Sequence, residues 1–239
     1  MAELIADRTW AIQGRTINLP VRLEGAEFAC AIFAADPSAT AELLSGAGLR
    51  PFTIAARSFS VLLLVHYPDW ALGSYDEVGI GVLARGPGGR SPAVHILDLP
   101  VTEPFTLEAG RDVWALPKWL MSADLRFRDT EATVGIHDGS TFVMRARLQA
   151  GRLGLPFRLP AKMPALNRID HGAQAGVLLR GTGAMSVRGT HLGRGRCDVD
   201  LGEHPMAHRM RALGMTRRPL LTVHARELSG ELDALAPVN

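Results

Sequence analysis

The segment Ala109-Gly-Arg-Asp-Val-Trp-Ala-Leu-Pro-Lys-Trp119 places one lysine among apolar and aromatic side chains. An ammonium group costs far more in such surroundings than in water, so we expect Lys118 to give up its proton more easily than a free lysine. A neutral amine is a nucleophile that can form a Schiff base with a carbonyl carbon. The alternative is an ordinary lysine whose stem covers the tryptophans while its charged end stays in water.

Lysine is rare in this chain, which supports a special role for this residue. The chain has two lysines, Lys118 and Lys162, and its other 24 residues with permanently basic side chains are arginines (26 Lys and Arg in total). Arginine keeps its charge at any working pH, whereas lysine can lose its proton and react with a carbonyl group. The choice of lysine at position 118 therefore favours covalent chemistry there.

The composition is that of an ordinary globular protein. The 239 residues include 47% hydrophobic and 21% charged residues, with a formal net charge of +2. This charge gives no reason to expect a nucleic-acid partner, and no apolar stretch is long enough to cross a membrane. The N-terminus lacks the order of a signal peptide. We predict a single domain over residues 1–239, located in the cytoplasm, with no nucleic-acid or membrane partner.

The cysteines and histidines show no spacing typical of a metal site. Cys30 and Cys197 lie in strand-like sequence without a CxxC partner, which predicts buried free thiols. His204 and His208 are four residues apart, but Pro205 places His204 before a helix, so the two need not share a face. We predict no metal and no cofactor.

Short strand-like segments dominate the rest of the sequence. A hairpin is predicted from residues 77–84 and 93–98, which flank the turn 86–89. Other segments typical of strands are residues 10–19, 28–33, 58–65, 123–128, 132–137, 141–148, 176–180, 185–191, 196–201 and 220–226. Helices are predicted over residues 36–44, 105–114 and 205–213, and the proline-broken stretch 155–167 is predicted to be a long surface loop that could act as a lid. This pattern favours an α+β fold, with a mainly antiparallel sheet curled into a closed barrel and a few packed helices.

Three motifs resemble the acetoacetate decarboxylase family. Gly110-Arg-Asp, followed by Trp114 and Leu116-Pro-Lys118, is similar to the family's active-site segment. Residues 72–77, Leu-Gly-Ser-Tyr-Asp-Glu, resemble its G-x-Y-x-E segment, and residues 203–213 resemble its C-terminal H-x-x-A segment and helix. The resemblance spans most of the chain.

The resemblance implies a function and a set of site residues. It implies Lys118 as the Schiff-base nucleophile and Glu77 as an active-site carboxylate. If burial raises its pKa, Glu77 would act as general acid and base at the imine. The alternative is a carboxylate at the rim that pairs with an arginine such as Arg111. Leu116, His95 and Trp119 are expected to line the substrate pocket. The family fold is a cone-like, largely antiparallel β-barrel with helices packed outside, and its members are usually homo-oligomers.

Three positions depart from the family pattern. Trp119 stands where true decarboxylases have a second lysine, directly after the nucleophile. Ala26 aligns with an arginine of the decarboxylases, and no glutamate stands near Leu62, where they have a second one. The residues that would handle a substrate carboxylate therefore differ in this chain.

Three functions follow from these motifs. The first is a lysine enzyme that decarboxylates a small oxo acid, most simply a β-keto acid such as acetoacetate. The second uses the same imine for aldol condensation with dehydration, or for cyclisation. The third is a barrel that binds a small ligand without catalysis, against which the retained lysine argues.

Overall fold

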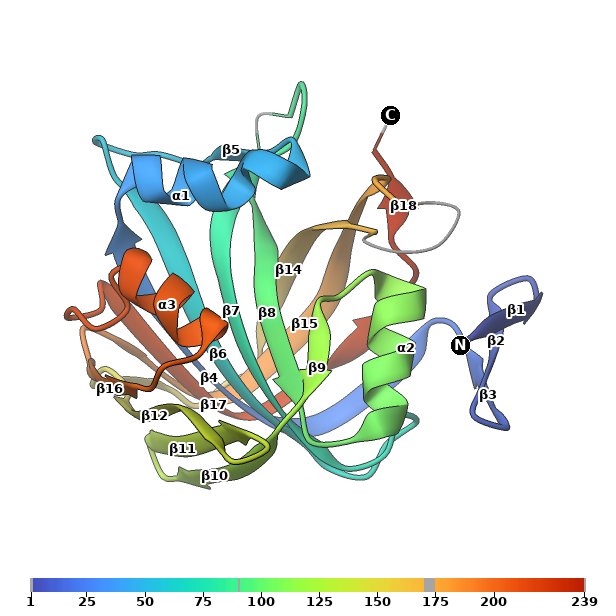
Figure 1. Ribbon diagram of the computed structural model, residues 1–239. Helices are drawn as coiled ribbons and strands as arrows, with labels where there is room; N and C mark the ends of the chain where they lie inside the picture. Colours follow the sequence, from blue (N-terminus) through green and yellow to red (C-terminus); the bar gives the residue numbers. More distant parts are fainter. Residues whose placement is uncertain (1, 90, 170–174, 239) are drawn as a thin grey trace.

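A seven-stranded barrel organises the protein. The computed structural model describes residues 2–89, 91–169 and 175–238. The barrel strands pair in the order β4, β6, β7, β8, β14, β15, β17 and back to β4, and every pairing is antiparallel except that of β8 with β14 (Figure 1). Their bounds are β4 Val21–Ala35, β6 Ser58–Tyr67, β7 Tyr75–Arg85, β8 Ala93–Val101, β14 Leu159–Arg168, β15 Leu178–Gly193 and β17 Leu221–Leu232. The predicted closed, mainly antiparallel barrel is confirmed.

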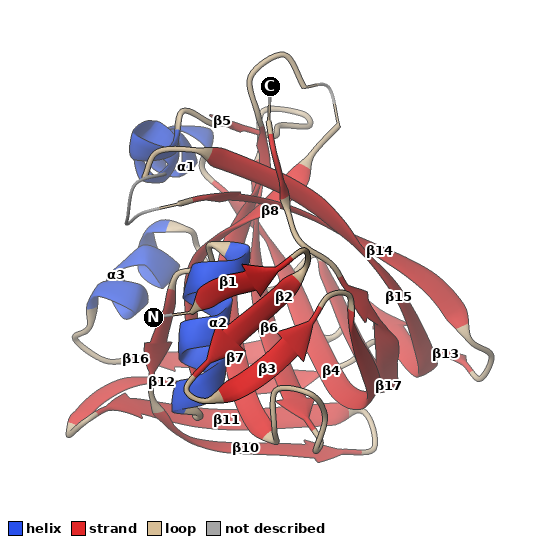
Figure 2. Ribbon diagram, turned by 90° about the vertical axis from the view of Figure 1, so that its right-hand side faces the viewer, coloured by secondary structure: helices blue, strands red, loops and turns tan. Residues whose placement is uncertain are grey.

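Two smaller sheets lie beside the barrel. A four-stranded sheet consists of β10 Ser122–Arg128, β11 Glu131–Asp138, β12 Thr141–Gln149 and β16 Arg196–Leu201. A three-stranded sheet at the N-terminus consists of β1 Glu3–Ala6, β2 Thr9–Ile12 and β3 Arg15–Asn18, and it lies next to α2 (Figure 2). Short strands extend the barrel sheet, namely β5 Arg50–Pro51, β9 Lys118–Leu120, β13 Leu153–Leu155 and β18 Ala236–Pro237.

Three α-helices form where the sequence predicts them: α1 Pro37–Leu44, α2 Pro104–Trp114 and α3 Pro205–Ala212. Each has a proline in its first turn, where the missing N–H has no intrahelical partner to lose. A 3₁₀ turn, Ser45–Ala47, follows α1. None of the helices in the described part of the chain is long and apolar enough to span a membrane.

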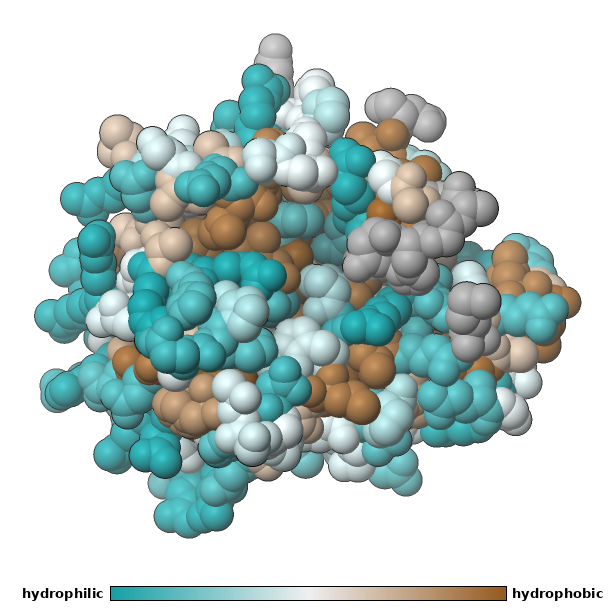
Figure 3. Space-filling model, in the orientation of Figure 1, coloured by the Kyte–Doolittle hydropathy of each residue, from teal (hydrophilic) through white to brown (hydrophobic). Residues whose placement is uncertain are grey.

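The barrel wall separates two apolar cores. The core on the side of α3 joins barrel residues such as Leu62 and Ile80 to α1, α3 and the four-stranded sheet. Figure 3 shows part of this apolar material as a brown area between α1 and α3. The core on the side of α2 joins Phe28, Val65 and Met185 to α2 and the N-terminal sheet. Neighbouring strand residues alternate between the two cores, because successive side chains of a strand point to opposite faces.

The two cysteines are buried free thiols, as predicted. Cys30 belongs to the core on the side of α2 and Cys197 to the core on the side of α3. Burial raises the pKa of each thiol to about 12, which keeps both in the unreactive protonated form.

The prediction of a surface loop over residues 155–167 is wrong, because most of this stretch is strand β14. Its residues pair with β15 along their whole length, including Pro160 and Pro164. Proline cannot donate to a ladder, but on its other side β14 pairs with β8 in strand register only at Ala165 and Val94. Prolines are therefore tolerated on this nearly open edge, and the stretch has no lid structure.

Candidate active site

A left-handed turn at the end of α2 directs the chain toward the lysine. Ala115 has a φ of 51°, and its N–H and that of Leu116 both donate to the Gly110 carbonyl. Pro117 then prevents the helix from continuing. The chain enters strand β9, which runs parallel to β8 with Lys118 opposite Leu99. Lys118 is therefore the first residue of a short strand.

The stem of Lys118 lies across a glycine of α2. A Cβ atom added at Gly110 would lie 2.5 Å from Lys118 Cε and closer still to Cδ, so any larger residue would collide with the stem. The Arg111 Nε donates to the Lys118 carbonyl oxygen over 2.7 Å. The Gly-Arg pair of the motif thus leaves space for the lysine side chain and holds its backbone.

The amino group of Lys118 is buried among polar partners on the side of α2. Its side chain is 4% exposed, and Nζ lies 2.8 Å from Glu77 Oε2 on β7. The same nitrogen donates to Thr106 Oγ1 over 3.0 Å and lies 5.3 Å from the centroid of the Tyr75 ring. The alternative of a lysine that reaches into water therefore does not hold.

Glu77 shares its carboxylate between the lysine and a tyrosine. The Tyr67 hydroxyl donates to Glu77 Oε1 over 3.1 Å, while Oε2 faces Lys118. The Tyr67 and Tyr75 rings stack with centroids 4.5 Å apart. Burial, and after it the Glu77 charge, raises the pKa of both tyrosines well above the usual value, so both hydroxyls stay protonated donors. Lys118, Glu77, Thr106, Tyr67 and Tyr75 are hereafter called the lysine cluster.

The remaining predicted site residues lie in different places. Leu116 packs partly buried against the core on the side of α2. Trp119 follows Lys118 on β9 and packs against the opposite core, as expected for successive strand residues. His95 pairs across the strands with Val82, which belongs to the core on the side of α3, and its Nδ1 lies 2.8 Å from the Leu166 carbonyl oxygen. The structure therefore does not bring Trp119 and His95 to the lysine cluster.

Several residues of the cluster were not singled out from the sequence. Tyr75 is part of the G-x-Y-x-E segment, so the motif contained a signal for it. Gly110 was part of the quoted motif, but its steric role depends on the path of Lys118 across α2. Tyr67 and Thr106 lie outside the quoted motifs, and only the fold places Tyr67 beside Glu77 and Thr106 beside Lys118.

The positions that depart from the family pattern carry no charge in the site. Ala26 is fully buried and Leu62 belongs to the opposite core. The residues that pair with Glu77 across the strands are Val65 and Val101, and Arg22 is exposed next to Glu231. Among the described residues, Lys118 is the one cation that contacts Glu77 within ion-pair distance.

The two histidines near α3 contact the helix backbone or acidic side chains. His204 caps the helix by accepting from the Met206 N–H, and its Nε2 lies 3.5 Å from Asp138 Oδ2. His208 Nε2 lies 2.9 Å from Glu203 Oε2. Within residues 2–89, 91–169 and 175–238, no group of three or more His, Cys, Asp or Glu side chains is placed to hold a metal ion.

Solved structures share this fold. A structure described as acetoacetate decarboxylase superposes with a TM-score of 0.70 at 15% identity, over 93% of this chain and 90% of the other. The acetoacetate decarboxylase of Legionella pneumophila gives 0.69 at 17% identity, over 94% and 91%. The enduracididine biosynthesis enzyme MppR in complex with pyruvate gives 0.68 at 13% identity, over 93% and 92%.

Sequence comparisons assign the chain to a family. No curated protein sequence matches the chain significantly. The family model described as acetoacetate decarboxylase, in contrast, matches residues 7–230, which include every member of the lysine cluster. The barrel that these residues build is also the fold of the solved decarboxylases. The chain therefore belongs to the acetoacetate decarboxylase family.

Proposed function

We propose that this protein is a Schiff-base lysine enzyme that decarboxylates a small β-keto acid such as acetoacetate. The observation that carries the proposal is the buried Lys118 Nζ, 2.8 Å from the Glu77 carboxylate and 3.0 Å from the Thr106 hydroxyl. Membership of the acetoacetate decarboxylase family supports it. The lysine itself supplies the reactive group, so the proposal needs no cofactor.

Imine formation uses the pair of Lys118 and Glu77. The ammonium passes a proton to Glu77 Oε2, and the free amine attacks the carbonyl carbon of the substrate. The resulting carbinolamine loses its hydroxyl group as water after Glu77 returns the proton to that oxygen. The product is a protonated imine, in which the nitrogen carries the positive charge.

Loss of carbon dioxide follows from that charge. The bond between the α-carbon and the carboxylate breaks, and its electron pair moves into the carbon skeleton to give an enamine and neutralise the nitrogen. A proton then adds to the α-carbon, and water hydrolyses the new imine to release the ketone and restore the Lys118 amine. In this scheme Tyr67 holds the Glu77 carboxylate in place, and Thr106 holds Nζ before the reaction.

Aldol condensation with dehydration, or cyclisation, is the second candidate, and the lack of a further cation in the lysine cluster favours it. No guanidinium of the described residues lies within ion-pair distance of Glu77, and Trp119 stands where the decarboxylases have a second lysine. The similar fold of MppR has been solved with pyruvate and with the condensation product of pyruvate and imidazole 4-carboxaldehyde. An enamine formed at Lys118 could attack an aldehyde carbon instead of taking up a proton.

The site gives further expectations about the protein in the cell. Its partner would be a small oxo acid, and a nucleic-acid or membrane partner is not part of the proposal. Because members of the family are usually homo-oligomers, we propose that this protein also forms a homo-oligomer. We propose that it is located in the cytoplasm. Light scattering on the purified protein at several concentrations tests the assembly, and a mass equal to one chain at every concentration would contradict it.

Trapping of the imine tests the proposed function. The protein is incubated with acetoacetate, with pyruvate or with no ketone, reduced with borohydride, and analysed by intact mass and peptide mapping. We expect a ketone-dependent mass gain at Lys118, which Lys118→Met abolishes and Lys162→Arg, a change at the exposed second lysine, leaves intact. Release of carbon dioxide from acetoacetate supports decarboxylation, whereas an adduct with pyruvate but no gas supports condensation. No adduct with either ketone would contradict both candidates and leave a binding barrel.

A further inference from the structure

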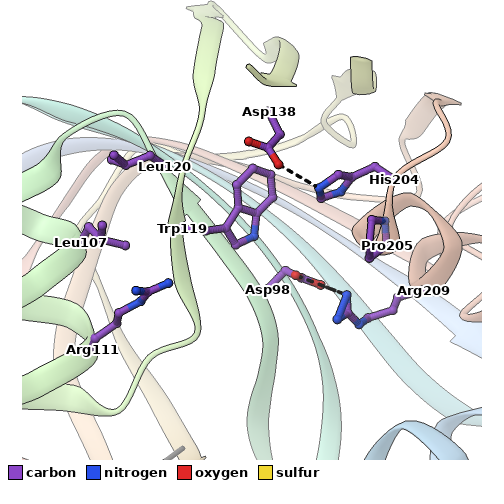
Figure 4. A pocket seen from close by; sticks show the side chains of 9 residues that line it. All are labelled: Asp98, Leu107, Arg111, Trp119, Leu120, Asp138, His204, Pro205 and Arg209. Carbon is purple, nitrogen blue, oxygen red and sulfur yellow. Dashed lines mark hydrogen bonds and ion pairs between the residues drawn. The ribbon is translucent and has the colours of Figure 1, made fainter. Parts of the chain in front are cut away.

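A cavity lies on the other side of strand β9 from the Lys118 side chain. It has a volume of about 390 Å³ and opens between α2, β9 and α3 (Figure 4). Its lining includes Asp98, Arg111, Trp119, Leu120, His204 and Arg209, whereas Lys118 and Glu77 do not line it. This volume lies in the range of about 300–1,000 Å³ that is typical of small-molecule sites. The cavity is hereafter called the outer pocket.

The charges that line the outer pocket leave one guanidinium unmatched. Arg209 Nη1 lies 3.2 Å from Asp98 Oδ2, and His204 faces Asp138. Burial raises the pKa of Asp98 to about 6, against the lowering effect of Arg209, so at pH 7 the Asp98 carboxylate is mostly ionised and neutralises that arginine. Arg111, in contrast, donates through Nε to the Lys118 carbonyl, and no carboxylate of the described residues lies within ion-pair distance of it. Arg111 is therefore the guanidinium of this lining that has no carboxylate of the described residues within ion-pair distance.

A flat apolar wall stands next to this charge. The Trp119 ring lies at the centre of the pocket, and the Arg111 side chain is directed toward it from α2 (Figure 4). On the other side, the His204 ring lies 5.1 Å from the Trp119 ring at an angle of 40°. Leu120 is 43% exposed at the rim, and Figure 3 shows brown surface beside α2, bordered by teal and white surface.

We propose that the outer pocket binds a small carboxylate that carries a flat apolar group, with the carboxylate on Arg111 and the apolar group against Trp119. A guanidinium binds a carboxylate through two parallel hydrogen bonds, and the Arg111 Nη atoms are left for this contact because Nε is already used. An indole ring offers a broad face for stacking a planar group. The proposal is independent of imine chemistry at Lys118.

The shared arginine connects the two sites. Arg111 holds the backbone of Lys118 through a 2.7 Å hydrogen bond and also lines the outer pocket. A carboxylate bound in the outer pocket would form hydrogen bonds with the same Arg111 guanidinium that holds Lys118. Occupancy of this pocket is therefore expected to change the rate of imine formation at Lys118. A small carboxylic acid made or consumed near this enzyme is therefore a candidate effector.

Calorimetric titration with benzoate as the probe tests the proposal. We expect saturable binding to the wild type, and at least about tenfold weaker binding of benzamide, which has the same ring without the charge. Arg111→Gln and Trp119→Leu should each weaken benzoate binding by about tenfold or more. Arg128→Gln, a change at an exposed arginine of β10, and Lys118→Met should leave benzoate affinity within about twofold of the wild type.

The variants separate the two sites and guard against misfolding. Trp119→Leu does not touch the hydrogen bond that holds Lys118, so it tests the pocket even where Arg111→Gln fails to fold. Absence of saturable binding to the wild type at about 10 mM benzoate would overturn the proposal. So would loss of benzoate binding in Lys118→Met with binding retained in Trp119→Leu, because the probe would then occupy the lysine cluster. A failure of imine trapping, in contrast, leaves this test unaffected.

Discussion

At the scale of single residues, a glycine makes room for the lysine that we propose as the nucleophile. Gly110→Ala would place a methyl group 2.5 Å from Lys118 Cε, which must then move away from Glu77. A displacement of about 1 Å from the productive geometry can cost roughly 100-fold in rate, so we expect a loss of that order in imine formation. Borohydride trapping over time measures this rate.

A second glycine provides the control for this steric effect. An added Cβ at Gly135 on β11 meets no atom within 4 Å, so Gly135→Ala should trap the imine at the wild-type rate. Equal rates for Gly110→Ala and the wild type would show that the contact between Gly110 and the lysine stem is not needed.

The carboxylate of Glu77 has two roles that one substitution can measure. Glu77→Gln removes the proton acceptor next to Nζ and leaves Lys118 without its ion-pair partner. General acid and base catalysis contributes roughly 10²- to 10⁴-fold, so we expect a fall in kcat of that size. Loss of one partner of a buried ion pair should also lower the free energy of unfolding by about 3–5 kcal/mol.

Tyr67→Phe is the matched comparison, because it removes the hydrogen bond to Glu77 but keeps the ion pair. Its cost in unfolding free energy should be about 1 kcal/mol, measured by denaturant titration of both variants. A kcat of Glu77→Gln close to that of the wild type would exclude Glu77 as the proton acceptor.

At the scale of elements, helix α1 shows how local sequence determines a helix boundary. Asp36 accepts from the N–H groups of Ser38 and Ala39 over 2.8 and 3.0 Å, and Pro37 starts the helix. Asp36→Ala leaves these donors without a partner, so we expect the free energy of unfolding to fall by about 1 kcal/mol. Asp36→Ser, which can still cap the helix, should cost much less. Thermal unfolding of the three proteins checks this, and equal stability of Asp36→Ala and the wild type would contradict it.

At the scale of the whole molecule, a buried histidine connects the barrel to the four-stranded sheet. His224 on β17 is 1% exposed, and its ring lies 5.7 Å from that of Phe127 on β10. Burial, followed by the charges of His191 and Arg226, lowers the pKa of His224 from 6.5 to about 4. Neither ring nitrogen has a hydrogen-bond partner among the described residues. The folded protein therefore holds this histidine neutral.

Stability should fall in acid because of this histidine. Between pH 6.5 and about 4 the unfolded chain binds a proton at His224 and the folded chain does not, so protonation favours unfolding as the pH decreases. The shift corresponds to a loss of at most about 3 kcal/mol between pH 7 and pH 4. His224→Leu should remove this part of the pH dependence, whereas the change of an exposed histidine, His208→Gln, should keep it. Urea titrations at several pH values provide the measurement, and parallel profiles for His224→Leu and the wild type would refute the prediction.

Much of the molecule was determined by local sequence. The helices near Asp36 and Pro205 and the hairpin around residues 86–89 were predictable, because caps, prolines and turn residues act on their neighbours. Lys118 was singled out by its apolar neighbours and by the rarity of lysine, whereas Glu77 was singled out only because residues 72–77 resemble a family motif. The alternation of apolar residues also indicated a barrel of mainly antiparallel strands.

Other features were decided by tertiary structure alone. The prolines of strand β14 make its sequence typical of a loop. They are tolerated in the strand because the neighbouring strand β8 leaves that edge nearly open, which only the tertiary structure shows. Trp119 is adjacent to Lys118 in sequence, yet strand geometry sends the two side chains to opposite faces, one to the lysine cluster and one to the outer pocket. Tyr67 reaches Glu77 from β6, and Thr106 reaches Lys118 from α2. The sequence thus pointed to the lysine that we propose as the nucleophile, and only barrel closure, which brings distant strands together, decided what surrounds it.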